Sequence, residues 1–443
     1  MKNKTHSIRY ASGLFALTLV SQLFHSFSYS YYVDTEALIS LNLATIAKVI
    51  FVIVDGLNDV IWGALSEKTI SKRGKRIPWL IYSLPFFPLS VTLTFLMNKS
   101  MNLSTGFFFF YYLTISLIFE NLSTIQYLNY GALFPLLFKE EKERGKVSTY
   151  KHAFEVVGLG ICLVLTPMLV QYIGYIGASL IYSVIFLIIM IYCIKGIRYD
   201  YSLDFQKDVK YSLKNTIKDF LTNKSIIIYH LSVSFILSSM SVLMTLYPIY
   251  AKYVLKINLF QQGILMAILF VGILSSLFIW NKLLVKFGHR KCWKISYCIF
   301  PFALASLSIP SSFLQGLITI IIVSPLIGGI LITPDLMSAE IIDIDKYKNK
   351  VSREASFMSL GTLTQRVSVM FSALFMSLIG TLFGYVDGNN PGSNPELTFR
   401  IIIGALLPLI ALLGSLLSII YIKKSKKDLE EYLNSNESDK KNI

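Results

Sequence analysis

Residues 179–192 read Ser-Leu-Ile-Tyr-Ser-Val-Ile-Phe-Leu-Ile-Ile-Met-Ile-Tyr, and they lie within a longer apolar run over 174–195. A run of about 20 apolar residues is long enough to cross the ~30 Å hydrocarbon core of a bilayer as a helix. The residues do not alternate in polarity, as the strands of a membrane β-barrel would. This stretch therefore predicts a membrane-spanning helix.

Comparable runs recur along the whole chain, and 54% of the 443 residues are hydrophobic. Only 15% are charged, against ~25% in an ordinary soluble protein. This composition excludes a disordered chain, and four cysteines in 443 residues exclude a secreted disulfide scaffold. We expect an all-α membrane protein with twelve transmembrane helices, the first being retained rather than cleaved. The predicted spans are 10–33, 39–65, 78–97, 106–137, 150–172, 174–195, 226–251, 261–284, 293–311, 313–341, 353–385 and 398–422.

The positive charge lies almost entirely on one side of these spans. The chain has 41 Lys and Arg against 26 Asp and Glu, a formal charge of +15. With twelve spans, 35 of the 41 basic residues fall on the side of both termini. The positive-inside rule then places both termini in the cytoplasm of a multi-pass protein of the plasma membrane. The charge thus orients the chain in the lipid bilayer and argues against a nucleic-acid partner. The opposite loops hold Lys99, Lys252, Lys256 and Arg400, and two basic residues, Lys48 and Arg366, lie inside spans.

The chain is predicted to consist of two six-helix halves that echo each other. We expect an N-terminal half at 1–195, a cytoplasmic connection at 196–224, a C-terminal half at 225–423 and a charged tail at 424–443. Three pairs of loop residues lie 214 positions apart. This repeated spacing favours a duplicated unit, as in two-half secondary transporters. The alternative is that the two loops are unrelated and are both basic because both are cytoplasmic. The pairs are Gly74 with Gly288, Arg76 with Arg290, and Trp79 with Trp293.

Two aspartates and an asparagine interrupt the second predicted span. Asp55, Asn58 and Asp59 have the spacing i, i+3, i+4, which puts them on one helical face. Charged groups in hydrocarbon are costly, so this face should line a cavity or meet a partner. Carboxylate and amide oxygens attract a hard cation, and paired carboxylates share a proton. The pattern predicts a site for a coupling cation, with a structural salt bridge as the alternative.

A buried arginine lies in the eleventh predicted span. Arg366 needs an anionic partner or ligand, and the carboxylates of Asp55 and Asp59 are the obvious candidates. It either neutralises that cluster or responds to cation binding and couples the two halves. No nucleophile–base pair, metal-ligand set or phosphate-binding loop is visible, so we expect no enzyme activity.

Several segments together resemble one transporter family. Residues 54–63 (VDGLNDVIWG) and 73–79 (RGKRIPW) are the most specific, and 129–135, 150–154 and 339–355 agree with them. They resemble the glycoside–pentoside–hexuronide:cation symporter family, the melibiose-carrier-like branch of the major facilitator superfamily. The resemblance covers nearly the whole chain, and it implies the major facilitator fold.

The resemblance also implies roles for particular residues. Asp55, Asn58 and Asp59 match the family's site for sodium, lithium or a proton, with Thr124 as a further ligand, and no other cofactor is implied. Arg366 stands where the family usually has a lysine near that site. Lys151 stands at a position usually held by arginine, and both are candidate coupling residues.

The galactoside-binding positions of the melibiose carrier are not kept. At the matching places this chain has Thr18, Tyr127 and Gly131 instead of an aspartate, an aspartate and a tryptophan. Transport of galactosides is therefore not expected, and other sugars remain open. We take Thr18, Gln22 and Tyr127 as candidate substrate contacts. A candidate cytoplasmic gate is formed by the loop residues Arg73, Lys75 and Arg76. The alternative is that these basic residues only orient the chain in the membrane.

The sequence predicts a secondary transporter that works by alternating access and functions as a monomer. The expected function is Na+- or H+-coupled symport of a small organic solute, most simply a sugar or glycoside. One alternative is an exporter or carrier of a lysolipid, peptide or other metabolite on the same fold. A second is a non-transporting sensor or partner subunit, although the short charged tail leaves no room for an output domain.

Overall fold

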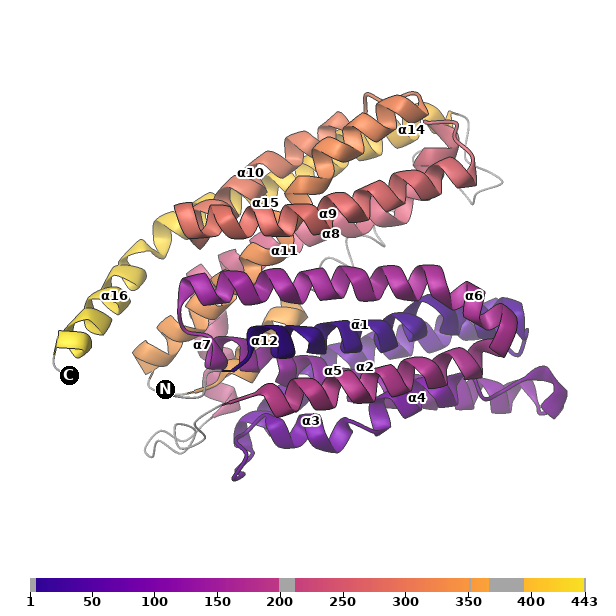
Figure 1. Cartoon of the computed structure of the whole chain (residues 1–443), viewed down its shortest axis with the longest axis horizontal. Helices are drawn as coiled ribbons and strands as arrows, with labels where there is room; N and C mark the ends of the chain where they lie inside the picture. The colour runs from indigo at the N-terminus through magenta and orange to yellow at the C-terminus, as the bar shows by residue number, and fades with distance from the viewer. Residues whose placement is uncertain (1–4, 199–211, 350–351, 366–393, 442–443) are drawn as a thin grey trace. The chain divides into compact units, whose positions relative to one another are not determined.

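Helices account for every regular element that the structure describes (Figure 1). This computed structural model describes residues 5–198, 212–349, 352–365 and 394–441. The helical content confirms the expected all-α class.

The chain divides into two compact units. The first comprises Met1–Leu213 together with Lys350–Leu360, and the second comprises Lys214–Asn349 together with Gly361–Ile443. Helix α12 (Glu354–Gln365) therefore begins in the first unit and ends in the second. The two units are defined by contacts between residues and not by membrane topology. The predicted bounds of the two six-helix halves therefore stay a prediction.

The first unit contains the six helices α1 to α6. Ser40 caps the start of α2 by accepting a hydrogen bond from the Leu43 N–H, and Ser104 caps α5 in the same way through Phe107. Pro85, which lacks an N–H, lies at the break between α3 and α4. The helices are α1 (Ser7–Ser30), α2 (Leu41–Lys68), α3 (Ile77–Ser83), α4 (Phe86–Thr94), α5 (Thr105–Leu137) and α6 (Glu141–Gly196), with a π-helical turn at Tyr31–Thr35.

Helix α6 folds back on itself at Gly174, whose φ of 68° and ψ of 173° are not helical. Thr166 and Tyr182 lie eight residues before and after Gly174, and their hydroxyls are 3.0 Å apart. In a straight helix, sixteen residues would separate them by about 24 Å. The 56 residues of α6 thus form two antiparallel stretches, at the positions of the fifth and sixth predicted spans.

Two tyrosines join the start of α1 to the last part of α5. Tyr10 donates its hydroxyl to the Tyr130 carbonyl at 2.7 Å, and Tyr130 donates to the Tyr10 carbonyl at 2.8 Å. The two rings stack with centroids 4.6 Å apart. Gly13 leaves room for this pair, because a Cβ at that position would lie 2.7 Å from the Tyr130 ring.

The second unit contains the remaining helices. Asn258 caps α9 with a capping box, in which Gln261 bonds back to the Asn258 N–H. Helix α8 packs against α15, and α11 packs against α9 and α10. The helices are α7 (Leu213–Thr222), α8 (Lys224–Tyr253), α9 (Leu259–Phe287), α10 (His289–Ser306), α11 (Phe313–Asn349), α14 (Pro395–Ile401), α15 (Leu407–Lys424) and α16 (Lys426–Lys441).

Seven helical segments of the described chain are long and apolar enough to cross a membrane, judged by length and composition. One of them, Glu141–Gly196, contains the turn at Gly174. The multi-pass membrane character is thus supported, while the count of twelve stays a prediction. The predicted span 353–385 lies mostly outside the described residues, which end at 365 in this region.

Candidate functional site

The three polar residues of the second predicted span lie on α2, which packs against α5. The side chains of Asp55, Asn58 and Asp59 are buried, each residue being 6% exposed. Two carboxylates and an amide removed from solvent require compensating charge or hydrogen bonds, because desolvating an ionised carboxylate is costly. This burial is what a cation or proton site needs.

Helix α5 contributes polar groups to the same place. Thr124 donates its hydroxyl to Asp59 Oδ1 at 3.5 Å. Glu120, one turn earlier on α5, is 7% exposed, and it interacts with Thr124 and with the charge of Asp59. The structure thus brings Thr124 to Asp59, as the sequence-based hypothesis requires. Glu120 is thus a buried acid near Asp59 that the sequence analysis did not include in the site.

The chemistry of this group fits a hard cation better than a transition metal. Within the described residues, no three His, Cys, Asp or Glu side chains gather closely enough to hold a metal ion. The candidate ligands are instead two carboxylates with neutral amide and hydroxyl oxygens, the set that suits a hard cation. Asn58 Nδ2 is buried and finds no hydrogen-bond partner among the described groups.

The predicted substrate contacts lie between α1 and α5. The Tyr127 hydroxyl is 2.8 Å from Ser21 Oγ, and Ser21 donates to the Thr18 carbonyl at 3.3 Å. Thr18 is only 4% exposed, and its Cβ lies 3.5 Å from the place of a Cβ on Gly158. Gln22 is half-buried on the same helix. The sequence analysis missed Ser21, whose i+3 spacing from Thr18 was the available signal.

Of the two predicted coupling residues, only Lys151 is described. Its Nζ lies 4.7 Å from the centroid of the Phe134 ring, and the residue is 6% exposed. Its neighbour His152 pairs with Glu155 at 2.7 Å. Arg366 lies outside the described residues, so its pairing with the α2 carboxylates stays a prediction.

The predicted gate loop contains one deeply buried arginine. Arg76 donates to Glu67 Oε1 at 2.6 Å, to Glu354 Oε2 at 3.2 Å and to Ser66 Oγ at 2.8 Å. Lys75 Nζ lies 3.7 Å from Glu67 Oε2. Arg73, by contrast, is exposed. The three basic residues are therefore not equivalent, because Arg76 is buried and bonds to both acids.

Backbone donors complete this ion cluster, formed by Arg76, Lys75, Glu67 and Glu354. The N–H groups of Ala355 and Ser356 donate to Glu67 Oε1 at 2.8 and 3.4 Å. A side-chain donor adds to them, since the Ser352 hydroxyl lies 2.8 Å from each carboxylate oxygen of Glu354. Both acids were missing from the sequence-based gate. Their signal was the buried arginine itself, since a desolvated guanidinium needs carboxylates.

The second unit carries a related cluster. Arg290 donates from Nε to Glu340 Oε1 and Oε2, each at 2.9 Å, and His289 Nε2 lies 2.7 Å from Glu340 Oε2. Arg290 follows Gly288 just as Arg76 follows Gly74, and both glycines have a φ of 79°. The echo read in the sequence therefore extends to backbone conformation and to a buried acid for each arginine.

A polar column (Asp55, Asn58 and Asp59 of α2) and an ion cluster around Arg76 lie among long apolar helices, an arrangement typical of membrane transporters. The sequence profile of the family described as MFS/sugar transport protein matches residues 9–423. The chain belongs to this family of major facilitator transporters.

Solved structures support the fold. The chain is similar to a bacterial homologue of the iron transporter ferroportin, with a TM-score of 0.70, 13% identity, and coverage of 94% of this chain and 99% of that one. It is also similar to the fucose:proton symporter of Escherichia coli, with a TM-score of 0.66, 12% identity, and coverage of 94% and 98%. These likenesses confirm the expected major facilitator fold.

Related sequences match over shorter regions. An uncharacterised symporter of Synechocystis sp. is 29% identical over 165 residues, 36% of this chain and 30% of that protein. A candidate sulfoquinovose importer of Escherichia coli (strain K12) is 27% identical over 214 residues, 45% of this chain and 44% of that protein. A sodium-dependent lysophosphatidylcholine symporter of Gallus gallus is 33% identical over 105 residues, 24% of this chain and 19% of that protein. Each match thus spans less than half of the relative's length.

Proposed function

We propose that this transporter is a symporter that couples a cation, Na+ or H+, to the movement of a small organic solute by alternating access. The observation that carries the proposal is the buried column on α2, in which Asp55, Asn58 and Asp59 are each 6% exposed and Asp59 meets Thr124. Buried carboxylates on a transporter helix supply the negative charge that a coupling ion neutralises. The sodium-dependent relative supports Na+ as the first ion to test.

Sodium binding is measurable before the solute is known. Trp62 lies three residues after Asp59 on α2, and its Nε1 donates to Asn121 on α5 at 2.9 Å. With Trp79, Trp280 and Trp293 replaced by Phe, Trp62 is the sole tryptophan, and its fluorescence should then report changes between these helices. We expect the purified full-length protein to change its fluorescence and gain thermal stability when KCl is replaced by NaCl. Asp55→Asn and Asp59→Asn should lose both responses, whereas Glu430→Gln, at an exposed residue of α16, should keep them.

The proton alternative has its own outcome in the same experiment. If sodium changes nothing but the fluorescence titrates with pH in the wild type and not in Asp59→Asn, the coupling ion is H+. A protein that responds to neither ion, with wild-type behaviour in both variants, would contradict cation coupling altogether.

For the solute, a sugar or glycoside is the first candidate, because the matching family is one of sugar transport proteins. Tyr127, Ser21 and Gln22 offer hydroxyl and amide groups that suit a sugar. The alternative is an amphipathic solute such as a lysolipid, as the name of the Gallus gallus relative suggests. Uptake of labelled sugars and of lysophosphatidylcholine into proteoliposomes, with and without a sodium gradient, separates the two; solute leaving the vesicles against its gradient would indicate an exporter.

We infer that the protein resides in the plasma membrane with both termini in the cytoplasm and that one chain suffices for transport. The charge asymmetry of the predicted loops supports the orientation. Impermeant maleimide should label cysteines placed at Lys99 and Lys252 in intact cells, and cysteines at Lys423 only after lysis. The reverse pattern would invert the topology. We assign the ion cluster around Arg76 to the closed cytoplasmic gate.

A further inference from the structure

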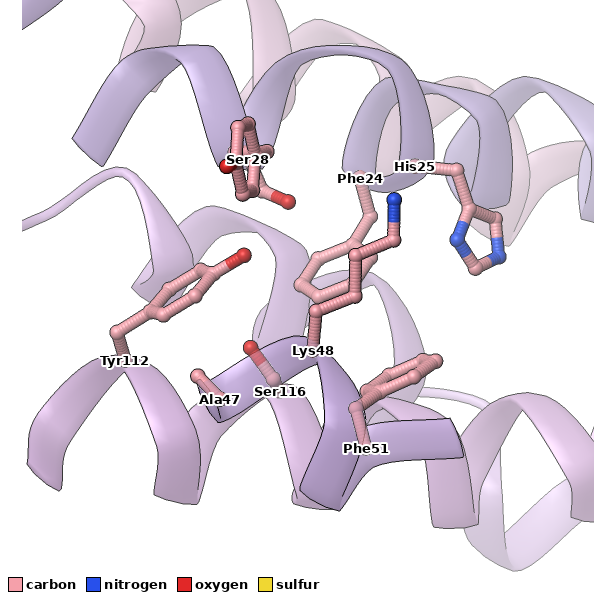
Figure 2. Close-up of a pocket in the computed structure, with 9 residues that line it drawn as sticks. Phe24, His25, Ser28, Ala47, Lys48, Phe51, Tyr112 and Ser116 are labelled. Carbon is pink, nitrogen blue, oxygen red and sulfur yellow. The ribbon is translucent and has the colours of Figure 1, made fainter. Parts of the chain in front are cut away.

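A cavity of about 80 Å³ lies in the first unit, and side chains of α1, α2 and α5 line it (Figure 2). It adjoins the polar column. Phe51 lies one turn before Asp55 on α2, and Ser116 lies one turn before Glu120 on α5, so the same two helices carry both features. The cavity therefore lies where a solute would sit beside a coupling cation.

Lys48 brings an amino group to this lining. The residue is exposed to the cavity, and Figure 2 shows its side chain reaching from α2 toward Phe24 and His25 of α1. Its Nζ lies 5.7 Å from the centroid of the Tyr29 ring. No carboxylate lines the cavity, and Lys48 forms no ion pair within the described parts of the chain. A lysine inside a predicted span, facing an opening without an anionic partner, is suited to bind an anion.

The rest of the lining is apolar or carries hydroxyls. The rings of Phe24 and Phe51 lie 6.2 Å apart with an interplanar angle of 22°, and Tyr112 closes another side. Ser28 and Ser116 add hydroxyl groups that can donate hydrogen bonds. One cation, two hydroxyls and flat aromatic walls together match an organic anion with a ring or apolar body.

We propose that Lys48 binds the acid group of the transported solute, so that the solute class is an organic anion with a ring or hydrocarbon body. The carboxylate, sulfonate or phosphate of the solute pairs with the Lys48 ammonium, and its body packs between Phe24, Phe51 and Tyr112. Lys48 precedes Asp55 by seven residues, about 10 Å along the helix. A bound anion and a coupling cation would then lie about two turns apart on α2. This inference rests on the proposed symport for its use, but binding itself does not require coupling.

The test compares two probes of nearly the same shape, the anion phenylacetate and the neutral phenylacetamide. Binding to the purified full-length protein is measured by calorimetry in phosphatidylcholine nanodiscs, at a fixed saturating NaCl concentration. We expect phenylacetate to bind at least tenfold more tightly than phenylacetamide. Lys48→Met should remove this preference, and Lys48→Arg should keep most of it. The matched control is Lys252→Met, since Lys252 also lies over a tyrosine ring, that of Tyr253 at 4.9 Å, but in the second unit.

The outcomes separate this inference from the proposed coupling. Equal affinity for both probes in the wild type, or an unchanged preference in Lys48→Met, would overturn the anion site even if sodium binding is found. A charge preference without any sodium response would keep the anion site and refute only the sodium coupling. Nanodiscs of phosphatidylglycerol test a lipid source: Lys48-dependent stabilisation by that lipid, with no phenylacetate binding, would overturn the proposal in favour of a lipid headgroup.

Discussion

Thr124 Oγ1 on α5 lies 3.5 Å from Asp59 Oδ1 on α2, so a neutral hydroxyl faces a buried carboxylate across the boundary of two helices. We predict that Thr124→Val weakens sodium binding by roughly 5–10-fold, because one neutral oxygen ligand contributes on the order of 1 kcal/mol. Thr124→Ser keeps the hydroxyl and should retain most of the affinity. Sodium titration of Trp62 fluorescence measures both. Equal affinities in the two variants would show that this hydroxyl is not a ligand.

In the ion cluster around Arg76, the two acids differ in the number and length of the hydrogen bonds that they accept. Glu67 accepts from Arg76 at 2.6 Å and from the Ala355 N–H at 2.8 Å, whereas Glu354 accepts from Arg76 at 3.2 Å. We predict that Glu67→Gln destabilises the protein more than Glu354→Gln, because breaking a fully buried ion pair costs about 3–5 kcal/mol. Thermal unfolding of the detergent-purified variants gives the order. Glu430→Gln, in the exposed tail helix, is the control and should change nothing.

Gly13 of α1 lies directly against the Tyr130 ring of α5. We predict that Gly13→Ala lowers stability by about 1–3 kcal/mol, since its Cβ would lie 2.7 Å from a packed ring and overpacking carries that cost. The matched change Gly160→Ala, also within a helix, meets no atom within 4 Å and should be neutral or slightly stabilising. The measurement is the thermal midpoint of each variant. Similar midpoints for both would mean that α1 and α5 part easily here.

The shared φ of 79° at Gly74 and Gly288 makes a parallel prediction. A residue with a side chain rarely adopts this φ, and at Gly288, where ψ is 156°, the backbone lies in a region almost confined to glycine, so a side chain there costs about 1–3 kcal/mol. Gly74→Ala and Gly288→Ala should therefore each lower stability by a similar amount. Gly263→Ala, with no atom within 4 Å of the added Cβ and no positive φ, serves as their control. Unequal losses would show that the two turns contribute differently to stability although their glycines share the same φ.

The sequence predicted the fold well because its signals are long and repeated. Apolar runs about 20 residues long identify membrane helices whatever their partners, and the position of basic residues orients them. The break at Gly174 was foreseen as the limit between two spans. What a run of apolar letters does not show is which helices touch, and so the reciprocal bonding of Tyr10 and Tyr130 was not foreseen.

The candidate site was predicted in part. The i, i+3, i+4 spacing of Asp55, Asn58 and Asp59 reveals a shared face within one helix, and their burial agrees with it. Partners from distant segments leave no such periodic signal. The pairing of Glu67 with Arg76 spans nine residues, but that of Arg76 with Glu354 spans 278, and only the folded chain brings them together.

Equivalent positions in the two repeats have also diverged. Counting 214 residues onward from Glu67 reaches Asn281, and counting back from Glu340 reaches Gln126. Each arginine thus keeps an acid, but the acid comes from a different helix in each unit. A repeat in sequence predicted the arginines and their loops, yet it did not predict which helix supplies the carboxylate.

The cluster around Arg76 also bears on how the chain is made. A ribosome delivers Glu67 and Arg76 early, but Glu354 and the N–H groups of Ala355 and Ser356 emerge only after some 280 further residues. Until then, a nascent first unit holds an incomplete set of buried charges. Its final closure must follow synthesis of five helices that the structure describes, α7 to α11. A first half expressed alone, cut at the central connection, would lack these groups permanently, so co-expressed halves should assemble only if the 352–360 segment can reach its partners.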